Sequence, residues 1–191
     1  MKIKKLSFGA FFLALGLLLP QVFHFLGGSA AGSIFLPMHI PVILAGLLLG
    51  YKYGALLGLL CPVLSFFVLS MPQIPMLYLM IIELMVYGLI SALLYKKLKL
   101  NIFLALILTM VAGRIAKSIL IFLALNVLNF SFPPALSTIP LLITGIPGIV
   151  IQIILIPTLV ILFERKYKFG WCWISKNNFE WKQFYLRDSF K

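Results

Sequence analysis

The stretch NIFLALILTMVAGRIAKSILIFLALN, residues 101–126, decides the fold class of this chain. Most of its 26 residues are apolar, and Arg114 and Lys117 are its only charged side chains. An α-helix rises about 1.5 Å per residue, so roughly 20 apolar residues cross the hydrocarbon core of a bilayer. The stretch therefore predicts a helix that crosses a membrane with two charges inside it.

Five further apolar segments accompany this stretch, with approximate limits 6–26, 35–50, 53–70, 76–95 and 137–163. The chain of 191 residues is 63% hydrophobic and only 10% charged, a composition that excludes a soluble domain. Helices satisfy their own backbone hydrogen bonds in lipid, and single segments here reach spanning length. We therefore expect an all-α integral membrane protein with a bundle of six transmembrane helices.

Basic residues alternate between the connections that join these segments. They precede the first segment and follow the second, fourth and sixth: Lys2, Lys4, Lys5, Lys52, Lys96, Lys97, Lys99, Arg165, Lys166 and Lys168. The loops 27–34, 71–75 and 127–136 carry no Lys or Arg. Because basic loops stay on the cytoplasmic side, we expect both termini to be cytoplasmic and these three loops to face outward, possible lids over a pocket. The net charge of +12 then reflects topology and does not indicate nucleic-acid binding.

Glu83, Arg114 and Lys117 are charges that lie deep inside apolar segments. A charge at the bilayer centre costs about 2.5–3.5 kcal/mol on insertion scales, so each should face a partner, a cavity or a ligand. Arg114 and Lys117 share a helix face, and Glu83 falls at a similar depth on the neighbouring antiparallel segment. One carboxylate cannot neutralise two cations. We expect Glu83 to orient Lys117 and Arg114 to bind a small anionic or zwitterionic solute; a purely structural ion pair or a proton relay are the alternatives.

Other polar side chains lie at a comparable depth or at the outer rim, namely His39, Gln152 and Asn126. Prolines on both sides of His39 interrupt backbone hydrogen bonds, which membranes tolerate mainly beside a cavity. Tyr87 is a candidate for stacking on a flat ring. The predicted substrate-binding residues are thus Arg114, Lys117, Glu83, His39, Gln152 and Asn126. The nucleotide-binding pattern GxxxxGK[ST] is absent, as are HExxH and CxxC, and we expect no catalytic residue, metal site or cofactor.

Two further patterns concern packing and the end of the chain. Gly46, Gly50, Gly54 and Gly58 recur every four residues, and small residues at that spacing let helices approach closely, or let backbone approach a ligand. We expect residues 1–168 to form the six-helix transmembrane substrate-binding domain. Residues 169–191 mix aromatic and basic side chains, and we expect a cytoplasmic tail, either on the anionic membrane surface or weakly ordered.

Over roughly residues 6–165 the chain resembles the substrate-binding S component of energy-coupling factor (ECF) vitamin transporters. The first segment carries Ala10-Phe11-Phe12-Leu13-Ala14, which matches the AxxxA motif of that family. The run Phe35-Leu36-Pro37-Met38-His39-Ile40-Pro41-Val42, followed by Ala45-Gly46 and Gly50, is similar to part of the second helix of some members. The number of helices and the inferred topology agree with this resemblance.

The resemblance implies a non-enzymatic subunit of an ABC transporter in the bacterial cell membrane. Such a subunit binds a vitamin or related small molecule in an outward-facing pocket, and here a carboxylate such as niacin or pantothenate suits the surplus cation. Ala10 and Ala14 would contact the membrane-embedded coupling (T) subunit, and two ATPase subunits would drive release. The absence of the nucleotide-binding pattern from this chain agrees with ATP hydrolysis by separate subunits. An autonomous small secondary transporter and a non-catalytic structural membrane subunit remain the alternatives.

Overall fold

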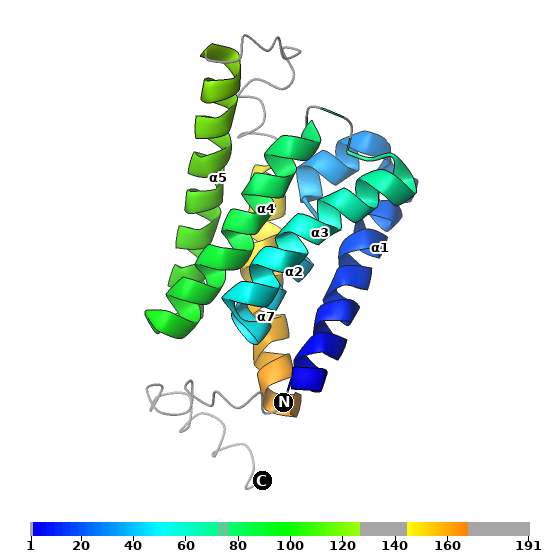
Figure 1. Ribbon diagram of the computed structural model, residues 1–191. Coiled ribbons are helices and arrows are strands. Elements are labelled where there is room, and N and C mark those ends of the chain that lie inside the picture. Colours follow the sequence, from blue (N-terminus) through cyan, green and yellow to red (C-terminus); the bar gives the residue numbers. More distant parts are fainter. Residues whose placement is uncertain (1, 73, 75, 127–144, 168–191) are drawn as a thin grey trace, which may run out of the picture.

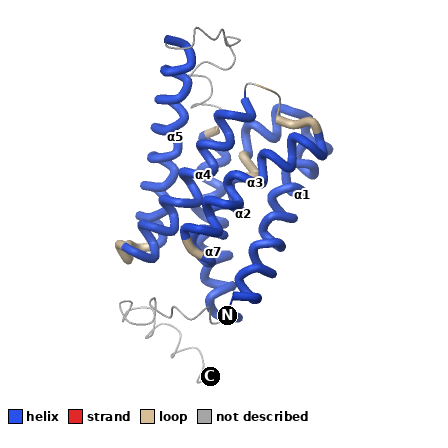
Figure 2. The backbone as a smooth tube through the Cα atoms, in the orientation of Figure 1, coloured by secondary structure: helices blue, strands red, loops and turns tan. Residues whose placement is uncertain are grey.

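The computed structural model describes residues 2–72, 74, 76–126 and 145–167, and no strand occurs among them. The elements are α1 (Lys2–Phe35), α2 (His39–Leu49), α3 (Tyr51–Leu69), α4 (Met76–Ala92), the π-helix η1 (Leu93–Lys97), α5 (Ile102–Asn126) and α7 (Ile146–Tyr167). Short connections join consecutive helices up to the end of α5 (Figure 2). The expected all-α fold is therefore confirmed.

Four helices are long and apolar enough to cross a membrane: Ile3–Phe25 within α1, Tyr51–Leu69, Met76–Lys97 and Ile102–Leu123. Two apolar helices are shorter, His39–Leu49 and Pro147–Phe163. The 11 residues of α2 cover only about 16 Å of the ~30 Å hydrocarbon core. The protein is thus a multi-pass membrane protein, and α2 is too short to cross the hydrocarbon core by itself.

The prediction of a loop at 27–34 is wrong, because α1 continues as a helix through these residues to Phe35. Glycines in this region have low helix propensity, but lipid offers no water to backbone groups that leave a helix, which favours its continuation. The chain reverses instead at Leu36, which has a positive φ of 49°. The expected loop 127–136 and the tail 169–191 lie outside the described residues.

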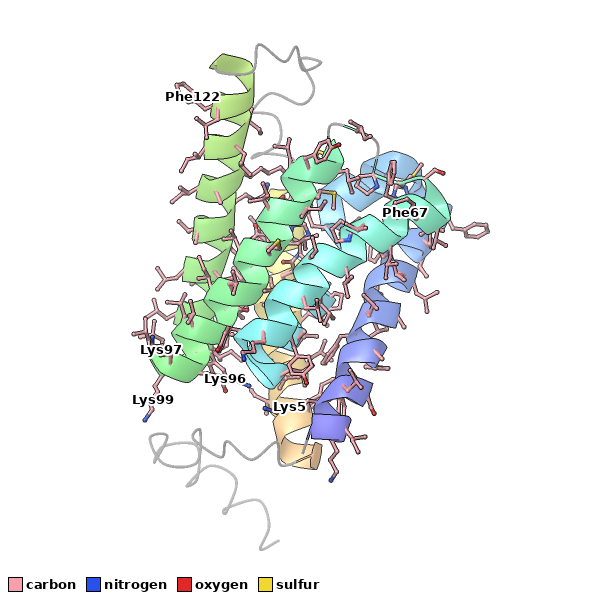
Figure 3. All side chains as sticks on the ribbon, in the orientation of Figure 1. Lys5, Phe67, Lys96, Lys97, Lys99 and Phe122 are labelled. Carbon is pink, nitrogen blue, oxygen red and sulfur yellow. The ribbon has the colours of Figure 1, made fainter. Side chains whose placement is uncertain are left out.

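Successive helices run in alternating directions, and α1 and α5 lie at opposite sides of the bundle (Figure 1). The short helix α2 is the centre of the fold: all of its residues are buried, and it contacts α1, α3, α4 and α7. Figure 3 shows Lys5, Lys96, Lys97 and Lys99 gathered at one end of the bundle. At that end Lys96 Nζ donates a hydrogen bond of 2.7 Å to the Leu48 carbonyl, which ties η1 to the last turn of α2.

Glycines bring the backbones of α2, α3 and α4 into direct contact. A Cβ built on Gly58 would lie 2.5 Å from the Leu84 carbonyl oxygen, and one on Gly54 would meet the carbonyl oxygen of Gly88. A Cβ on Gly46 would lie 2.6 Å from the same Gly88 oxygen. These distances confirm the predicted close packing of helices at three of the four glycines. The fourth, Gly50, has a φ of 108° and makes the turn between α2 and α3.

Substitution of Gly58 with alanine should lower the free energy of unfolding by about 1–3 kcal/mol, because the α3 and α4 backbones would have to separate. Gly9→Ala is the matched control, since its Cβ would meet Tyr53 Cδ1 at an ordinary 3.6 Å. Unfolding in detergent, followed by circular dichroism, measures both variants. Equal stability of Gly58→Ala and the unchanged protein would contradict the backbone contact.

Candidate functional site

An ion pair joins α4 and α5 inside the bundle. Lys117 Nζ lies 2.7 Å from Glu83 Oε2, Glu83 is fully buried, and Lys117 is 4% exposed. The contact predicted between these two segments is therefore present. Such a pair keeps two charges in a region of low dielectric only because each compensates the other.

The second oxygen of Glu83 faces two rings. Tyr87 donates a hydrogen bond of 3.3 Å to Glu83 Oε1, and His39 Nε2 lies 3.7 Å from the same oxygen. The His39 and Tyr87 rings meet edge to face with centroids 5.0 Å apart. We call these four residues, His39, Glu83, Tyr87 and Lys117, the Glu83 cluster. It joins the first residue of the half-length helix α2 to α4 and α5.

Local sequence explains how α4 and α5 meet at the Glu83 cluster. Glu83 and Tyr87 are four residues apart, so both side chains project from one face of α4. Across the interface stands Gly113 of α5, where a Cβ would lie 2.6 Å from Cζ of the Tyr87 ring. The absence of a side chain at Gly113 thus leaves the space that the Tyr87 ring occupies.

Arg114 lies next to the Glu83 cluster, at 8% exposure, on the same face of α5 as Lys117. It lies close enough to Tyr87 to interact with it electrostatically. The guanidinium also packs against Gly145, just before α7, where a Cβ would lie 3.0 Å from Cζ of Arg114. Arg114 therefore connects the Glu83 cluster to the backbone that precedes α7.

An open cavity of about 410 Å³ with an almost entirely apolar surface lies between α5 and α7. Arg114 is among its lining residues, but the Nε and Nη2 atoms of the guanidinium are buried. Ser118 contributes the other polar side chain of its lining. In the sequence, Glu83 is the only acidic residue before Glu164, so Arg114 and Lys117 leave one positive charge in excess at this depth. A guanidinium beside a cavity can bind a carboxylate with two parallel hydrogen bonds.

Of the other predicted binding residues, His39 lies in the Glu83 cluster, whereas Gln152 and Asn126 lie outside it. His39 belongs to the Glu83 cluster, is 2% exposed, and neither ring nitrogen makes a hydrogen bond within the described residues. Gln152 is buried and donates a hydrogen bond of 3.2 Å to the Leu36 carbonyl, so it links α7 to the turn before α2. Asn126 ends α5, about 18 Å along the helix from Arg114, and its side chain lies outside the description.

Three residues of this region carry contacts that sequence reasoning missed. Tyr87 was a candidate for stacking on a flat ring; the structure buries it, and its hydrogen bond to Glu83 was not predicted, although the spacing of one helical turn was an available signal. Gly113 and Gly145 make room for Tyr87 and Arg114. Their contacts cross between distant segments, and no local pattern indicates them.

The outer face of α1 carries the small residues of the AxxxA motif. Ala10 and Ala14 are both exposed, and α1 lies at the edge of the bundle away from α5 (Figure 1). No described helix covers this stripe, which is therefore open to lipid or to another membrane protein.

Comparison with known proteins gives one match. The family described as "ECF transporter, substrate-specific component" matches residues 4–160, from the first turn of α1 into α7. No curated protein and no solved structure matches the chain at a significant level.

Proposed function

Since the chain belongs to the family of substrate-specific components of ECF transporters, we propose that its substrate is a small carboxylate-bearing molecule, a vitamin or a related compound. The observation that carries this proposal is the burial of two cations, Arg114 and Lys117, on one face of α5 beside the carboxylate of Glu83. An anionic substrate restores the balance. Niacin, pantothenate and similar acids have the required group.

In this proposal the residues around Arg114 have different roles. Glu83 neutralises Lys117 and fixes its ammonium group, so Arg114 is the cation that meets the substrate. Tyr87 donates a hydrogen bond to Glu83 and so helps to hold that carboxylate against Lys117. His39, whose ring nitrogens donate no hydrogen bond to described residues, and Gln152 border this region. Asn126 would lie nearer the substrate's entrance.

The remaining parts of the proposal concern the transporter as a whole. Both termini and the lysine-rich end of the bundle are assigned to the cytoplasm of a bacterial cell, and the opposite end to the outside. A membrane-embedded coupling subunit and two ATPase subunits would complete the complex, with Ala10 and Ala14 at the contact. Residues 169–191 would form a basic aromatic tail at the inner membrane surface.

The direct test is mass spectrometry of small molecules that copurify with the chain, against a mock purification from the same cells. A carboxylic acid enriched with the protein is expected, and uptake of that acid should require the coupling and ATPase subunits. A neutral or cationic ligand would contradict the carboxylate proposal. Uptake by the chain alone would instead support an autonomous secondary transporter.

Ala10→Leu should leave substrate affinity unchanged and lower uptake by roughly tenfold or more, because a larger side chain prevents close helix approach at the AxxxA stripe. Binding to purified protein and uptake by cells that contain the complete transporter measure the two effects. Val68→Leu, at an exposed position of α3, is the control for added bulk on the lipid-facing surface. Normal uptake by Ala10→Leu would show that α1 is not the docking face.

A further inference from the structure

Lysines from three parts of the chain surround the turn between α2 and α3. A Cβ built on Gly50, in this turn, would lie 3.8 Å from Lys96 Nζ, and Lys52 is the second residue of α3. On α1, a Cβ on Gly9 would contact residues on both sides of the same turn, and Lys5 lies one helical turn before Gly9. Figure 3 shows two more lysines at this end, after Lys96. We call these five residues the basic patch: Lys5, Lys52, Lys96, Lys97 and Lys99.

The described helices bring little negative charge to the basic patch. Three of its lysines are exposed, and Lys5 and Lys96 are half-buried. The last turns of α7 lie at the same end of the bundle (Figure 1), where Glu164 is the only acidic residue of a described helix and is followed by Arg165 and Lys166. The patch therefore attracts anions from outside these helices.

Two exposed apolar side chains lie among these lysines. Tyr51 begins α3 beside Lys52 and is 51% exposed, and Leu98 lies between Lys97 and Lys99 and is 61% exposed. Tyrosine favours the membrane–water interface, because its ring is apolar and its hydroxyl can reach polar groups. The leucine side chain is more favourably placed against acyl chains than in water. A phospholipid can use both kinds of side chain, whereas a free phosphate can use only the lysines.

We infer that the basic patch binds an anionic phospholipid, with its lysines on the headgroup phosphate and with Tyr51 and Leu98 against the glycerol and the first part of the acyl chains. Each lysine near an anionic membrane surface adds to the attraction. A lipid here would also stabilise the end of α2, because Lys96 Nζ holds the Leu48 carbonyl at 2.7 Å. This inference does not depend on the proposed substrate, since it concerns the end of the bundle that carries the lysines.

Two phospholipids with identical dioleoyl chains test the headgroup. Phosphatidylglycerol is anionic and phosphatidylcholine is zwitterionic, and native mass spectrometry of the full chain in detergent measures the binding of each. We expect phosphatidylglycerol to bind more tightly by roughly tenfold or more, and to raise the unfolding temperature more. Glycerol phosphate at millimolar concentration should not displace it, because it lacks acyl chains.

The other results would overturn the inference. Equal affinity for the two lipids would show that the patch does not select an anionic headgroup, and would favour an acidic protein surface as its partner. Displacement of phosphatidylglycerol by glycerol phosphate would show a site for soluble anions in place of a lipid site.

Charge-matched double variants locate the lipid on the bundle. Lys52→Gln with Lys97→Gln removes two exposed lysines of the patch and leaves the bond of Lys96 to the Leu48 carbonyl in place. It should weaken phosphatidylglycerol binding by roughly tenfold or more, with an unchanged circular dichroism spectrum.

The control removes the same charge near the end of the chain, by Lys176→Gln with Lys182→Gln, and should leave the affinity unchanged. Equal losses in the two double variants would show that affinity follows net charge alone, which would overturn the site. Should the patch variant fail to fold, Lys97→Gln alone serves, with an expected loss of roughly threefold to fivefold. Full affinity in the folded patch variant would also overturn the assignment.

Discussion

Replacing Arg114 with alanine should weaken substrate binding by more than roughly tenfold while the helix bundle remains folded. A hydrogen bond to a charged partner contributes about 1.5–3 kcal/mol, and a guanidinium can supply two of them to one carboxylate. Folding should tolerate the change, because the Glu83–Lys117 ion pair that joins α4 and α5 remains intact. Equilibrium binding of the copurified acid, together with thermal unfolding, measures both quantities.

Arg114→Lys provides the informative comparison. Lysine keeps the positive charge but lacks the planar fork, so its affinity should fall between those of alanine and arginine. Lys99→Ala, at an exposed position in the turn after η1, controls for a general loss of positive charge. Unchanged affinity in Arg114→Ala would remove the carboxylate clamp from the mechanism.

Glu83→Gln should lower the free energy of unfolding by about 3–5 kcal/mol, because it leaves the buried ammonium of Lys117 without its compensating charge. The contact of 2.7 Å and the complete burial of Glu83 make this the largest stability effect expected in the bundle. Lys117→Met should cost a similar amount, since it leaves an uncompensated carboxylate.

The double variant Glu83→Gln, Lys117→Met decides whether the two residues act as a pair. It should be more stable than either single variant, because no unpaired charge remains. Chemical unfolding of all four proteins in one detergent gives the coupling free energy. Additive losses in the double variant would contradict a direct ion pair. Substrate affinity of the double variant then reports whether the pair does more than support the fold.

Much of the fold follows from apolar length, because helices that bury their own backbone groups are the main solution available in lipid. The segment expected at 101–126 is α5 almost residue for residue. The predicted bounds 35–50 are less accurate, since α2 begins at His39. Continuation of α1 to Phe35 was missed, because Gly and Ser usually indicate a loop in water and the membrane shifts that balance.

The candidate site was predictable where depth and spacing alone determine contacts. Glu83 and Lys117 could be paired because they lie at similar depths on antiparallel neighbours, and the structure brings them together. The surroundings of Arg114 could not be found in this way. Gly145 lies just before α7, about 30 residues along the chain from Arg114, and no pattern in the local sequence indicates their contact.

The glycine contacts between α2, α3 and α4 also bear on how this protein can diversify. Most side-chain changes at Gly54, Gly58 or Gly88 would force two backbones apart, so these positions should accept few mutations. The apolar cavity is lined from α5 and α7, outside that glycine-packed core. Mutations at cavity-lining positions such as Ile107 or Ile149 can therefore change the shape of the cavity while the core sequence stays constant. Deep mutational scanning should find more tolerance at the aliphatic cavity-lining positions of α5 and α7 than at these glycines.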